Sequence, residues 1–383
     1  SLLSIYLLNI NIHNNRDYSI KLKNSIESSG CIIIKLFQWT LPRYHMVYGD
    51  TILYNILHDL YSNCNQHSLE YTKEIYLNEF NKQLLDDYNI IEVIGSGSIG
   101  QVYKVQDKNT GYYYALKVLH PHLDTQYKLF KYFIKFINTF INFRKYIPIY
   151  NFNEYIQSLE IQLNMVNEYN NINRFREIYS NSNLINIPNV YKHSENILLM
   201  DYISGLCIND TELSLYNKHK YTLYLSIFTY NSGINGVLHG DLHIGNWNIN
   251  IHENKLNIYD FGYIFNLKEE EFNLIERIIH NPHKLEYLDN FLFFYLNKEY
   301  NNHLNNDTIY EQYKNIIHKY IESLSIVDMQ DIIHQLFRFI IDSHIFVSNE
   351  CLNCLIIFLQ LINIYNSGEF CINDNSADAK IYK

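Results

Sequence analysis

Residues 237–249 read VLHGDLHIGNWNI, and the chemistry of this stretch decides which fold to expect. His239 and His243 flank Asp241, an arrangement that could hold a metal ion on a strand. The alternative is a loop in which Asp241 is the working carboxylate and Asn246, five residues later, supplies an amide oxygen. Zn²⁺ prefers a fuller set of nitrogen and sulfur ligands, and no third ligand accompanies the histidines. The loop is therefore favoured, with the two histidines expected to hydrogen-bond and orient it.

A second acidic motif follows nineteen residues after Asp241, where Asp260 heads Asp-Phe-Gly in IYDFG. Between them, NWNINIHENKLNI predicts two short strands around a turn. An Asp, an Asn five residues later and a downstream Asp-Phe-Gly form the pattern by which phosphotransferases act on an attacking hydroxyl or water and hold Mg²⁺. Asp241 is then the catalytic residue. Asn246 and Asp260 are the expected Mg²⁺ ligands, because that ion prefers hard oxygen atoms.

Upstream, IGSGSIGQVYKV supplies a glycine-rich turn followed by a strand-like run. Its G-x-G-x-x-G pattern lets backbone N–H groups approach phosphates closely. A Rossmann turn shares the pattern but opens a helix, so the strand that follows here favours a flap over ATP. An ordinary tight hairpin is the remaining alternative. The residues expected to contact ATP here are Gly95, Ser96, Gly97, Ser98, Val102, Ala115 and Lys117.

Lys117 stands in the strand-like run YALKVLH. It can reach nucleotide phosphates if an acidic side chain orients it. Glu168, in the helical stretch QLNMVNEYNN, is the best candidate for that partner. The alternative is a surface lysine and a solvated glutamate with no common role.

Composition narrows the remaining classes of protein. A formal net charge of −10 argues against nucleic acid as the main partner. The cysteines show no disulfide spacing, which indicates a reducing compartment. Cys351 and Cys354 form a CxxC, but their helical, apolar surroundings favour a buried core over a metal site. No segment is long and apolar enough to cross a membrane. The N-terminal SLLSIYLLNI lacks the basic region of a signal peptide and an initiator Met, which suggests a trimmed or processed chain.

These patterns predict an α+β, two-lobed, protein-kinase-like fold with a helical N-terminal extension. The extension spans residues 1–86. A small β-rich lobe with a helical insertion spans 87–203, and a helical lobe with the catalytic and metal-binding loops spans 204–383. In the insertion, KLFKYFIKFINTFINFRK interleaves lysines with aromatic residues. One face could lie on an anionic bilayer, but packing against the small lobe is favoured. Its basic residues are Lys128, Lys131, Lys135, Arg144 and Lys145.

From about residue 26 to about residue 370 the sequence resembles the UbiB family, the aarF-domain atypical kinases linked to ubiquinone synthesis. The stretches that carry the similarity are SSGCIIIKLFQW, SGSIGQVYKV, QLNMVNEYNNINRFRE, NILLMDYISG, LHGDLHIGNW and IYDFG. The resemblance implies that Met200, Asp201 and Tyr202 are the gatekeeper and hinge of an ATP site.

The resemblance also implies a regulatory region. Lys35 and Gln38 match the Lys and Gln of the family motif KxGQ, which folds over the active site and restricts protein phosphorylation. Phe37 replaces the glycine of that motif. Gln162 and Asn164 replace the two carboxylates of the E-x-D motif that faces it.

By resemblance the protein is an ATP- and Mg²⁺-dependent atypical kinase or ATPase that acts on, or is regulated by, lipids or small molecules. The expected partners are ATP, membrane lipid or a quinone precursor, and proteins of quinone-lipid biosynthesis. The expected location is at a membrane, mitochondrial, plastid or bacterial. Two alternatives stay open: a catalytically weak nucleotide-sensing scaffold, and a protein serine/threonine kinase.

Overall fold

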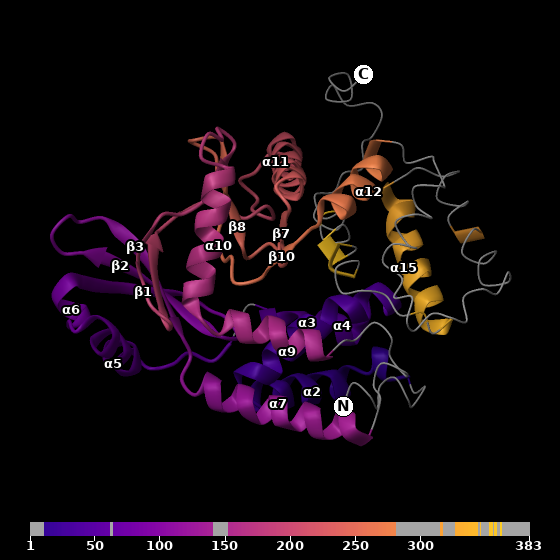
Figure 1. The fold of residues 1–383 in the computed structure, drawn as a ribbon, viewed down its shortest axis with the longest axis horizontal. Coiled ribbons are helices and arrows are strands. Elements are labelled where there is room, and N and C mark those ends of the chain that lie inside the picture. The colour runs from indigo at the N-terminus through magenta and orange to yellow at the C-terminus, as the bar shows by residue number, and fades with distance from the viewer. Residues whose placement is uncertain are drawn as a thin grey trace.

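The computed structural model describes residues 11–61, 64–140, 152–280, 315–316, 326–343, 345, 352–354, 356–357 and 361. In this part of the chain an antiparallel sheet lies at one end, and a larger, mainly helical body lies beside it (Figure 1). The helices of the N-terminal extension run along one side of both. The small β-rich lobe and the helical lobe predicted from the sequence are both present.

The sheet of the small lobe has five strands in the order β1-β2-β3-β6-β5, and each neighbouring pair is antiparallel. The three strand-like runs around the glycine-rich turn and the KNTG turn are confirmed as β1, β2 and β3, and NILLMD is confirmed as β6. The bounds are β1 (Tyr88–Ser96), β2 (Gly100–Asp107), β3 (Tyr113–Leu119), β5 (Val190–His193) and β6 (Ile197–Asp201).

The alternation of side chains along β3 assigns its residues to two cores. Leu116 and Val118 pack with Tyr76 and Leu84 of the extension on one face. Ala115 and Leu119 face the core of the helical body. Because Lys117 has the same parity as the second pair, it points toward the helical body as well. The strand pattern therefore positions the lysine between the lobes.

The N-terminal extension is helical up to the first strand, as its patterns predict. Its helices are η1 (Asn11–Asn14), α2 (Arg16–Ser28), α3 (Cys31–Tyr48), α4 (Ile52–His58), η2 (Asp59–Tyr61), α5 (Leu69–Phe80) and α6 (Leu84–Asp87). Helices α2, α3 and α4 share a core of their own, in which Phe37 packs with Leu53 and Leu57. Helix α3 also lies beside α7 (Leu123–Phe140) and crosses toward α9 (Phe152–Gln162; Figure 1).

The second helical stretch of the insertion is divided into two helices, where the sequence pattern suggests a continuous run. Helix α9 (Phe152–Gln162) ends just before Asn164, and α10 (Met165–Ile178) begins after it. The break has a local cause: Asn164 has extended backbone, and its side chain accepts a hydrogen bond from the N–H of Val166 at 2.9 Å. Asn is among the residues that cap helix N-termini best.

The helical body carries short strands that hold its loops. The two strands predicted around HENK are confirmed as β8 and β9, and β4 joins them in a three-stranded sheet; β7 and β10 form a separate pair. The bounds are β4 (Ile185–Asn186), α11 (Leu215–Ile234), β7 (Val237–His239), β8 (Trp247–Asn250), β9 (Lys255–Ile258), β10 (Ile264–Asn266), α12 (Glu269–His280) and α15 (Ile326–Asp342).

Two other expectations concern this region and the membrane. Cys354 is buried, as the core interpretation of the CxxC predicts, whereas Cys351 lies outside the described residues. None of the described helices is long and apolar enough to span a bilayer.

Candidate active site

Lys117 is the centre of a group of charges between the lobes. Its Nζ donates to both carboxylate oxygens of Glu168, at 2.8 and 2.9 Å, and lies 3.0 Å from Oδ1 of Asp260. The side chains of Lys117 and Glu168 are only 8% and 5% exposed, whereas that of Asp260 is 43% exposed. The ion pair predicted between Lys117 and Glu168 is therefore present, and the structure adds Asp260 as a second carboxylate, open toward solvent.

The three charges set one another's protonation. Burial on its own would lower the pKa of Lys117, but the two carboxylates outweigh it and raise that pKa well above its usual range. Burial would raise the pKa of Asp260, but the charges of Lys117 and Lys35 hold it well below its usual range. The pKa of Glu168 is raised by burial, which the charge of Lys117 only partly offsets. The lysine is thus a fixed cation, and Asp260 is a fixed anion.

The backbone of Asp260 is strained. Its φ of 64° lies in the left-handed region, and such residues cost on the order of 1–3 kcal/mol each unless their surroundings enforce the conformation. Here the backbone carbonyl accepts a hydrogen bond from His239, and Oδ1 accepts one from the N–H of Gly262 at 3.3 Å. Together with Lys117, these contacts fix the direction of the carboxylate.

His239 links the two acidic loops. Its Nε2 lies 2.9 Å from the carbonyl oxygen of Asp260, and its Nδ1 lies 3.1 Å from the backbone N–H of Asp241. A carbonyl can only accept, so Nε2 donates and Nδ1 accepts, which is one tautomer of a neutral ring. Burial lowers the pKa of His239 to about 4, in agreement with that state. The predicted backbone hydrogen bonding is confirmed, and both ring nitrogens are occupied by it.

Asn246 and His243 shape the loop that carries Asp241. The side-chain amide of Asn246 donates to the carbonyl of Asp241 at 2.8 Å, which leaves its Oδ1 as an acceptor. His243 accepts the N–H of Gly245 at 3.0 Å, and its Nε2 lies 4.0 Å from the carboxylate of Asp241. No group of three His, Cys, Asp or Glu side chains in the described residues is placed to hold a metal. The hydrogen bond from Gly245 is consistent with the orienting role expected for His243.

The glycine-rich turn joins β1 to β2 above these groups. A Cβ on Gly95 would meet nothing within 4 Å, and one on Gly97 would meet only the carbonyl oxygen of Gly100, at 3.7 Å. Among the described residues, none accepts a hydrogen bond from the N–H groups of Ser98 and Ile99 at the tip. A strand–turn–strand with unused N–H groups fits a phosphate flap, and the register pairs Val102 of β2 with Lys117.

The predicted hinge lies at the end of β6. Met200 pairs with Ala115 in the register of β3 and β6, and both are buried. The carboxylate of Asp201 is used locally, because it accepts hydrogen bonds from Asn189 and Tyr191 at 2.7–2.8 Å. Its backbone N–H is used as well, because it donates to the carbonyl of Asn189 at 3.0 Å, so the role of Asp201 and Tyr202 as the hinge stays a prediction.

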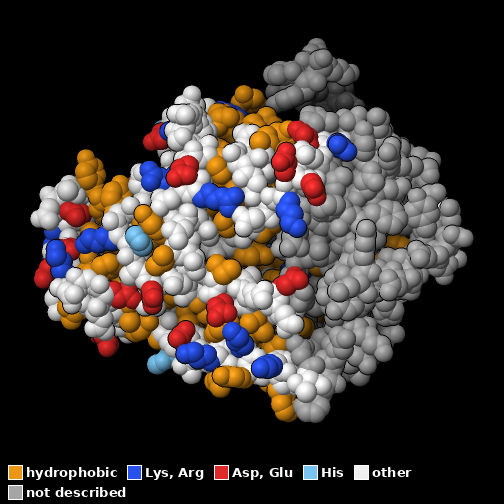
Figure 2. Space-filling view, viewed as in Figure 1, with side chains coloured by type: hydrophobic (Ala, Val, Ile, Leu, Met, Phe, Trp, Pro, Cys, Tyr) orange, Lys and Arg blue, Asp and Glu red, His pale blue; other side chains and the backbone are white. Residues whose placement is uncertain are grey.

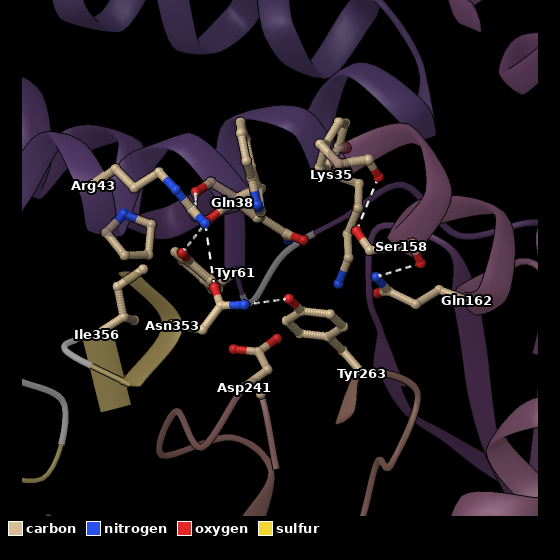
Figure 3. A pocket seen from close by; sticks show the side chains of 14 residues that line it. Lys35, Gln38, Arg43, Tyr61, Ser158, Gln162, Asp241, Tyr263, Asn353 and Ile356 are labelled. Carbon is tan, nitrogen blue, oxygen red and sulfur yellow. Dashed lines mark hydrogen bonds between the residues drawn. The ribbon is translucent and has the colours of Figure 1, made fainter. Parts of the chain in front are cut away.

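A cleft opens on the other side of Asp241, under helix α3 (Figure 3). Asp241 points into it from below, beside Tyr263, while α3 supplies its roof. Among the described residues that line it, two cations accompany amides and aromatic rings, and Asp241 is the only acid. The lining residues are Lys35, Gln38, Trp39, Pro42, Arg43, Tyr61, Tyr155, Ser158, Gln162, Gly240, Asp241, Tyr263, Asn353 and Ile356.

The residues predicted to be regulatory fall in different places. Lys35 and Gln162 reach the cleft, and Gln38 joins its roof to the glycine-rich turn, because Oε1 of Gln38 accepts the hydroxyl of Ser98 at 2.8 Å. Asn164 is not among the residues that line the cleft, and its side chain caps α10, so its regulatory role stays a prediction.

Phe37 has a structural explanation. Where the family motif has glycine, this side chain turns into the core of the extension and is 8% exposed. Its size is therefore taken up by packing against α4, and it leaves the active site unobstructed.

Comparison with known proteins identifies the class. A family model described as the ABC1 atypical kinase-like domain matches residues 59–287. The chain belongs to this family.

Curated relatives support the assignment of an ABC1 domain. The protein activity of bc1 complex kinase 3, chloroplastic, from Arabidopsis thaliana is 28% identical over 205 residues, which is 49% of this chain and 28% of that protein. The probable serine/threonine-protein kinase abkC of Dictyostelium discoideum is 27% identical over 237 residues, 59% of this chain and 34% of that protein. The chain thus matches about a third or less of these relatives' length. A further A. thaliana relative, 24% identical over 186 residues, is named as an aarF domain-containing protein kinase, so the predicted UbiB/aarF membership is confirmed.

Among solved structures, Rv3197 of Mycobacterium tuberculosis, determined in complex with erythromycin, has a TM-score of 0.54 at 14% identity. The match covers 80% of this chain and 83% of that one. This similarity supports the fold alone, and with the family it confirms the two-lobed kinase-like architecture.

The residues of this ABC1 domain fit an Mg²⁺ ion. Asp260 is ionised, partly exposed and held by three contacts, and Asn246 keeps an amide oxygen as acceptor. Both are hard oxygen donors of the kind that Mg²⁺ prefers. In a kinase-like site the ion would neutralise phosphate charge, and Lys117, 3.0 Å from Asp260, would supply a second cation.

Several residues of the site were missed from the sequence. The contact of Gln38 with Ser98, the contact of Arg43 with Asn353 across 310 positions, and Tyr263 against Gly240 all depend on tertiary packing. Only Tyr263 carried a local signal, because it directly follows the Asp-Phe-Gly motif.

Proposed function

We propose that this protein is an Mg²⁺- and ATP-dependent atypical kinase or ATPase of the UbiB type. The observation that carries the proposal is the buried Lys117–Glu168 pair, with its lysine in contact with Asp260. Buried charges are costly unless paired, and a lysine shared between two carboxylates is the arrangement that places a cation beside nucleotide phosphates. Membership of a kinase-like family supports a phosphotransferase in general terms.

For the phosphate acceptor we propose a small molecule or lipid, or water in the ATPase reaction. Helix α3 roofs the cleft in which Asp241 lies, and the turn above it is tied to that roof through Gln38. A protein substrate that binds as an extended segment needs an open groove beside Asp241. After Asp-Phe-Gly the chain passes through β10 directly into α12, which leaves little length for a peptide-docking segment. By resemblance, the wider role is support of quinone-lipid biosynthesis.

Binding and turnover of Mg²⁺-ATP test the proposal. We expect the wild type to bind ATP only with Mg²⁺ and to hydrolyse or transfer the γ-phosphate. Asp260→Asn is expected to lose the Mg²⁺ dependence and to lower turnover by at least about 100-fold, because the metal-binding carboxylate is removed. Asp86→Asn, an exposed change on α6, is the matched control. Absence of Mg²⁺-ATP binding by the wild type, or an unchanged Asp260→Asn, contradicts the proposal.

A second candidate is a nucleotide-sensing scaffold with little turnover. It is favoured by Lys35, which enters the cleft from α3 and lowers the pKa of Asp260 by its charge. A lysine there competes with a metal ion for the same carboxylate. Lys35→Ala is expected to raise turnover if the scaffold state is imposed by this lysine. An unchanged rate in Lys35→Ala would remove the support that this residue gives to the second candidate.

For the membrane partner we propose an anionic lipid surface that meets helix α7. The helix has two apolar faces: Leu123, Tyr127, Phe130 and Ile134 are buried in the core, as the packing interpretation expects. A second row is 57–70% exposed and consists of Leu129, Tyr132, Phe133 and Phe136.

Lysines border the exposed row. At 3.6 residues per turn, Lys128, Lys131 and Lys135 lie between the buried and exposed faces of α7, and Figure 2 shows blue and orange side chains together along the lower edge of the molecule, over this helix. Aromatic residues with flanking lysines suit the interface of an anionic bilayer. Two of the lysines lie near carboxylates, because Lys128 is 3.5 Å from Asp124 and Lys131 is 3.4 Å from Glu160, so the exposed aromatic row is the main support for this surface. Arg144 and Lys145 lie outside the described residues. The organelle stays a proposal; two relatives are named as chloroplastic.

Sedimentation with vesicles tests this surface. Wild-type protein is expected to bind vesicles of phosphatidylcholine with phosphatidylglycerol more strongly than vesicles of phosphatidylcholine alone. The double variant Phe133→Ser with Phe136→Ser should bind about 10-fold more weakly. The matched control is Tyr216→Ser with Leu223→Ser on α11, whose residues are equally exposed. Equal binding by both double variants contradicts the assignment.

A further inference from the structure

His120 contacts the glycine-rich turn through both its backbone and its ring. It follows the last residue of β3 and is 5% exposed. Its backbone N–H donates to the carbonyl of Ile99 at 2.9 Å, and Nε2 lies 3.0 Å from the carbonyl oxygen of Gly97. Two of the carbonyls in the turn are thereby turned toward His120. Their peptide planes also orient the N–H groups of Ser98 and Gly100 on the following residues.

A chain of hydrogen bonds fixes the tautomer of this ring. Because the carbonyl of Gly97 can only accept, Nε2 of His120 carries the proton, and its Nδ1 is an acceptor. That Nδ1 lies 2.8 Å from Nδ1 of His67, which must therefore donate. Nε2 of His67 then accepts from the hydroxyl of Thr72 at 2.9 Å, and Thr72 accepts from Tyr103 at 2.9 Å. Each bond in the series has one direction, and the series ends at Gly97.

The surroundings keep this pair of histidines neutral. The titratable groups that pack against it are Tyr71, whose ring is 5.0 Å from that of His67, and Tyr103, and burial raises the pKa of both. Burial lowers the pKa of His120, and burial together with His120 lowers the pKa of His67 to about 4. The backbone of His67 is also held in place, because its N–H donates to Oε1 of Gln101 at 2.9 Å.

We propose that His120 is a positioning residue for the nucleotide flap and that His67 holds it in the donating tautomer. The inference rests on the proposed binding of Mg²⁺-ATP. Because His120 is hydrogen-bonded to the turn, the shape of the turn is set before a nucleotide binds. Ser96 accepts the N–H of Cys64 at 3.2 Å, and Ser98 donates to Gln38, so the tip is also held from the extension. With the carbonyl of Gly97 held back by His120, the unused N–H groups of Ser98 and Ile99 are available to phosphate oxygens.

Two substitutions of His120 separate positioning from bulk. Glutamine carries its amide nitrogen at about the reach of histidine Nε2, whereas asparagine carries it at about the reach of Nδ1. We therefore expect His120→Asn to weaken Mg²⁺-ATP binding about 3- to 10-fold, the effect of one lost hydrogen bond. His120→Gln should restore binding to within about 2-fold of the wild type. Binding is measured by isothermal titration calorimetry, with thermal unfolding of the nucleotide-free proteins alongside.

The outcomes are distinct. No binding by the wild type defeats the proposed function itself. Binding by the wild type together with equal dissociation constants for His120→Asn overturns the positioning role alone, as does a His120→Gln variant as weak as His120→Asn. If His120→Asn does not fold, nitrogen-15 NMR of histidine-labelled wild type decides at neutral pH, with the His120 signal assigned by its absence in His120→Gln. A neutral ring with Nε2–H supports the inference, and a neutral ring with Nδ1–H or a charged ring overturns it.

Discussion

The two sides of Asp241 are built differently. On the nucleotide side, charges meet in pairs: Lys117 contacts Glu168 and Asp260, and the strain at Asp260 is supported by His239. On the cleft side, under α3, amides and aromatic rings surround one acid and two cations. The nucleotide side has the parts common to kinase-like sites. The cleft side is lined in part by helices α3 and α9, and we propose that the acceptor is selected there.

The difference teaches where each kind of substitution acts. A buried ion pair that loses one partner leaves an uncompensated charge, which is among the costliest changes in a protein. A cleft lined by amides and rings tolerates loss of single contacts better but responds to changes of shape. Changes on the nucleotide side are thus expected to affect folding and turnover together, and changes on the cleft side to affect turnover mainly through geometry.

The largest effect is expected for Lys117→Ala. Without the lysine, Glu168 and Asp260 face each other with no cation between them, so the free energy of unfolding should fall by about 3–5 kcal/mol, and turnover should be lost. Urea unfolding at neutral pH measures this. Lys73→Ala on α5 is the control, because its acidic neighbour Glu70 is 3.9 Å away and largely exposed, so the pair should matter by less than about 1 kcal/mol. A similar loss in the free energy of unfolding for both lysine variants would contradict the difference expected between a buried and a surface ion pair.

A change of shape on the cleft side ranks second. A Cβ on Gly240 would lie 2.4 Å from the ring of Tyr263, so Gly240→Ala should displace that ring into the cleft beside Asp241. Overpacking of this kind costs about 1–3 kcal/mol. Turnover is expected to fall more than ATP affinity, as kinetics and calorimetry can show.

Gly95→Ala on the nucleotide side is the matched comparison. The added methyl meets nothing within 4 Å, so stability should stay within about 1 kcal/mol of the wild type. If Gly240→Ala were as stable as Gly95→Ala, Tyr263 would not be packed against the loop as described.

A smaller effect on stability is expected from Asn164, the residue that caps α10. Asn164→Ala removes the cap of α10, the helix that carries Glu168, and should cost about 1 kcal/mol in thermal unfolding. Asn164→Asp keeps the cap, because its carboxylate can accept the same N–H, and should be neutral to stabilising at the helix N-terminus. A larger effect on turnover in Asn164→Asp than in Asn164→Ala would instead place this side chain at the cleft.

A further expected effect is on the pH dependence of stability. The folded pKa of His67 is about 4, below the value of about 6.5 in an unfolded chain, so the unfolded state takes up the proton more readily. Stability should therefore rise from about pH 4 to about pH 6.5 and level off above. His67→Phe should reduce this slope but not abolish it, since His239 contributes over the same range. Urea unfolding across that interval measures the difference, and an unchanged slope would contradict the assignment of His67.

The parts of the fold and the site that could be predicted from the sequence are those encoded in short, local motifs. Asp241, Asn246 and Asp260 lie in short motifs whose spacing reflects one loop and one hairpin, and the strand alternation places Lys117. Even its partner Glu168, 51 positions away, could be named, because a kinase-like site requires an acid on the following helices.

Other parts were set by packing that no local pattern encodes. The break between α9 and α10 needed the capping role of Asn164, which sits in a run of good helix periodicity. The tie between Gln38 and Ser98 joins an extension helix to a loop of the sheet. The histidine pair arises because a coil before α5 passes beside the end of β3. In each case a side chain that reads as ordinary in sequence obtained its role from a distant segment.

The central claim is that the nucleotide side is competent for catalysis and not only for binding. Asp241→Asn tests it most directly, because the carboxylate lies in the cleft and is not part of the Lys117 group. Mg²⁺-ATP affinity and single-turnover hydrolysis are measured for the wild type and this variant, with and without anionic vesicles. We predict equal affinities within about 3-fold and a loss of turnover of at least about 100-fold in the variant. A wild type that binds Mg²⁺-ATP but turns it over no faster than Asp241→Asn would contradict the claim.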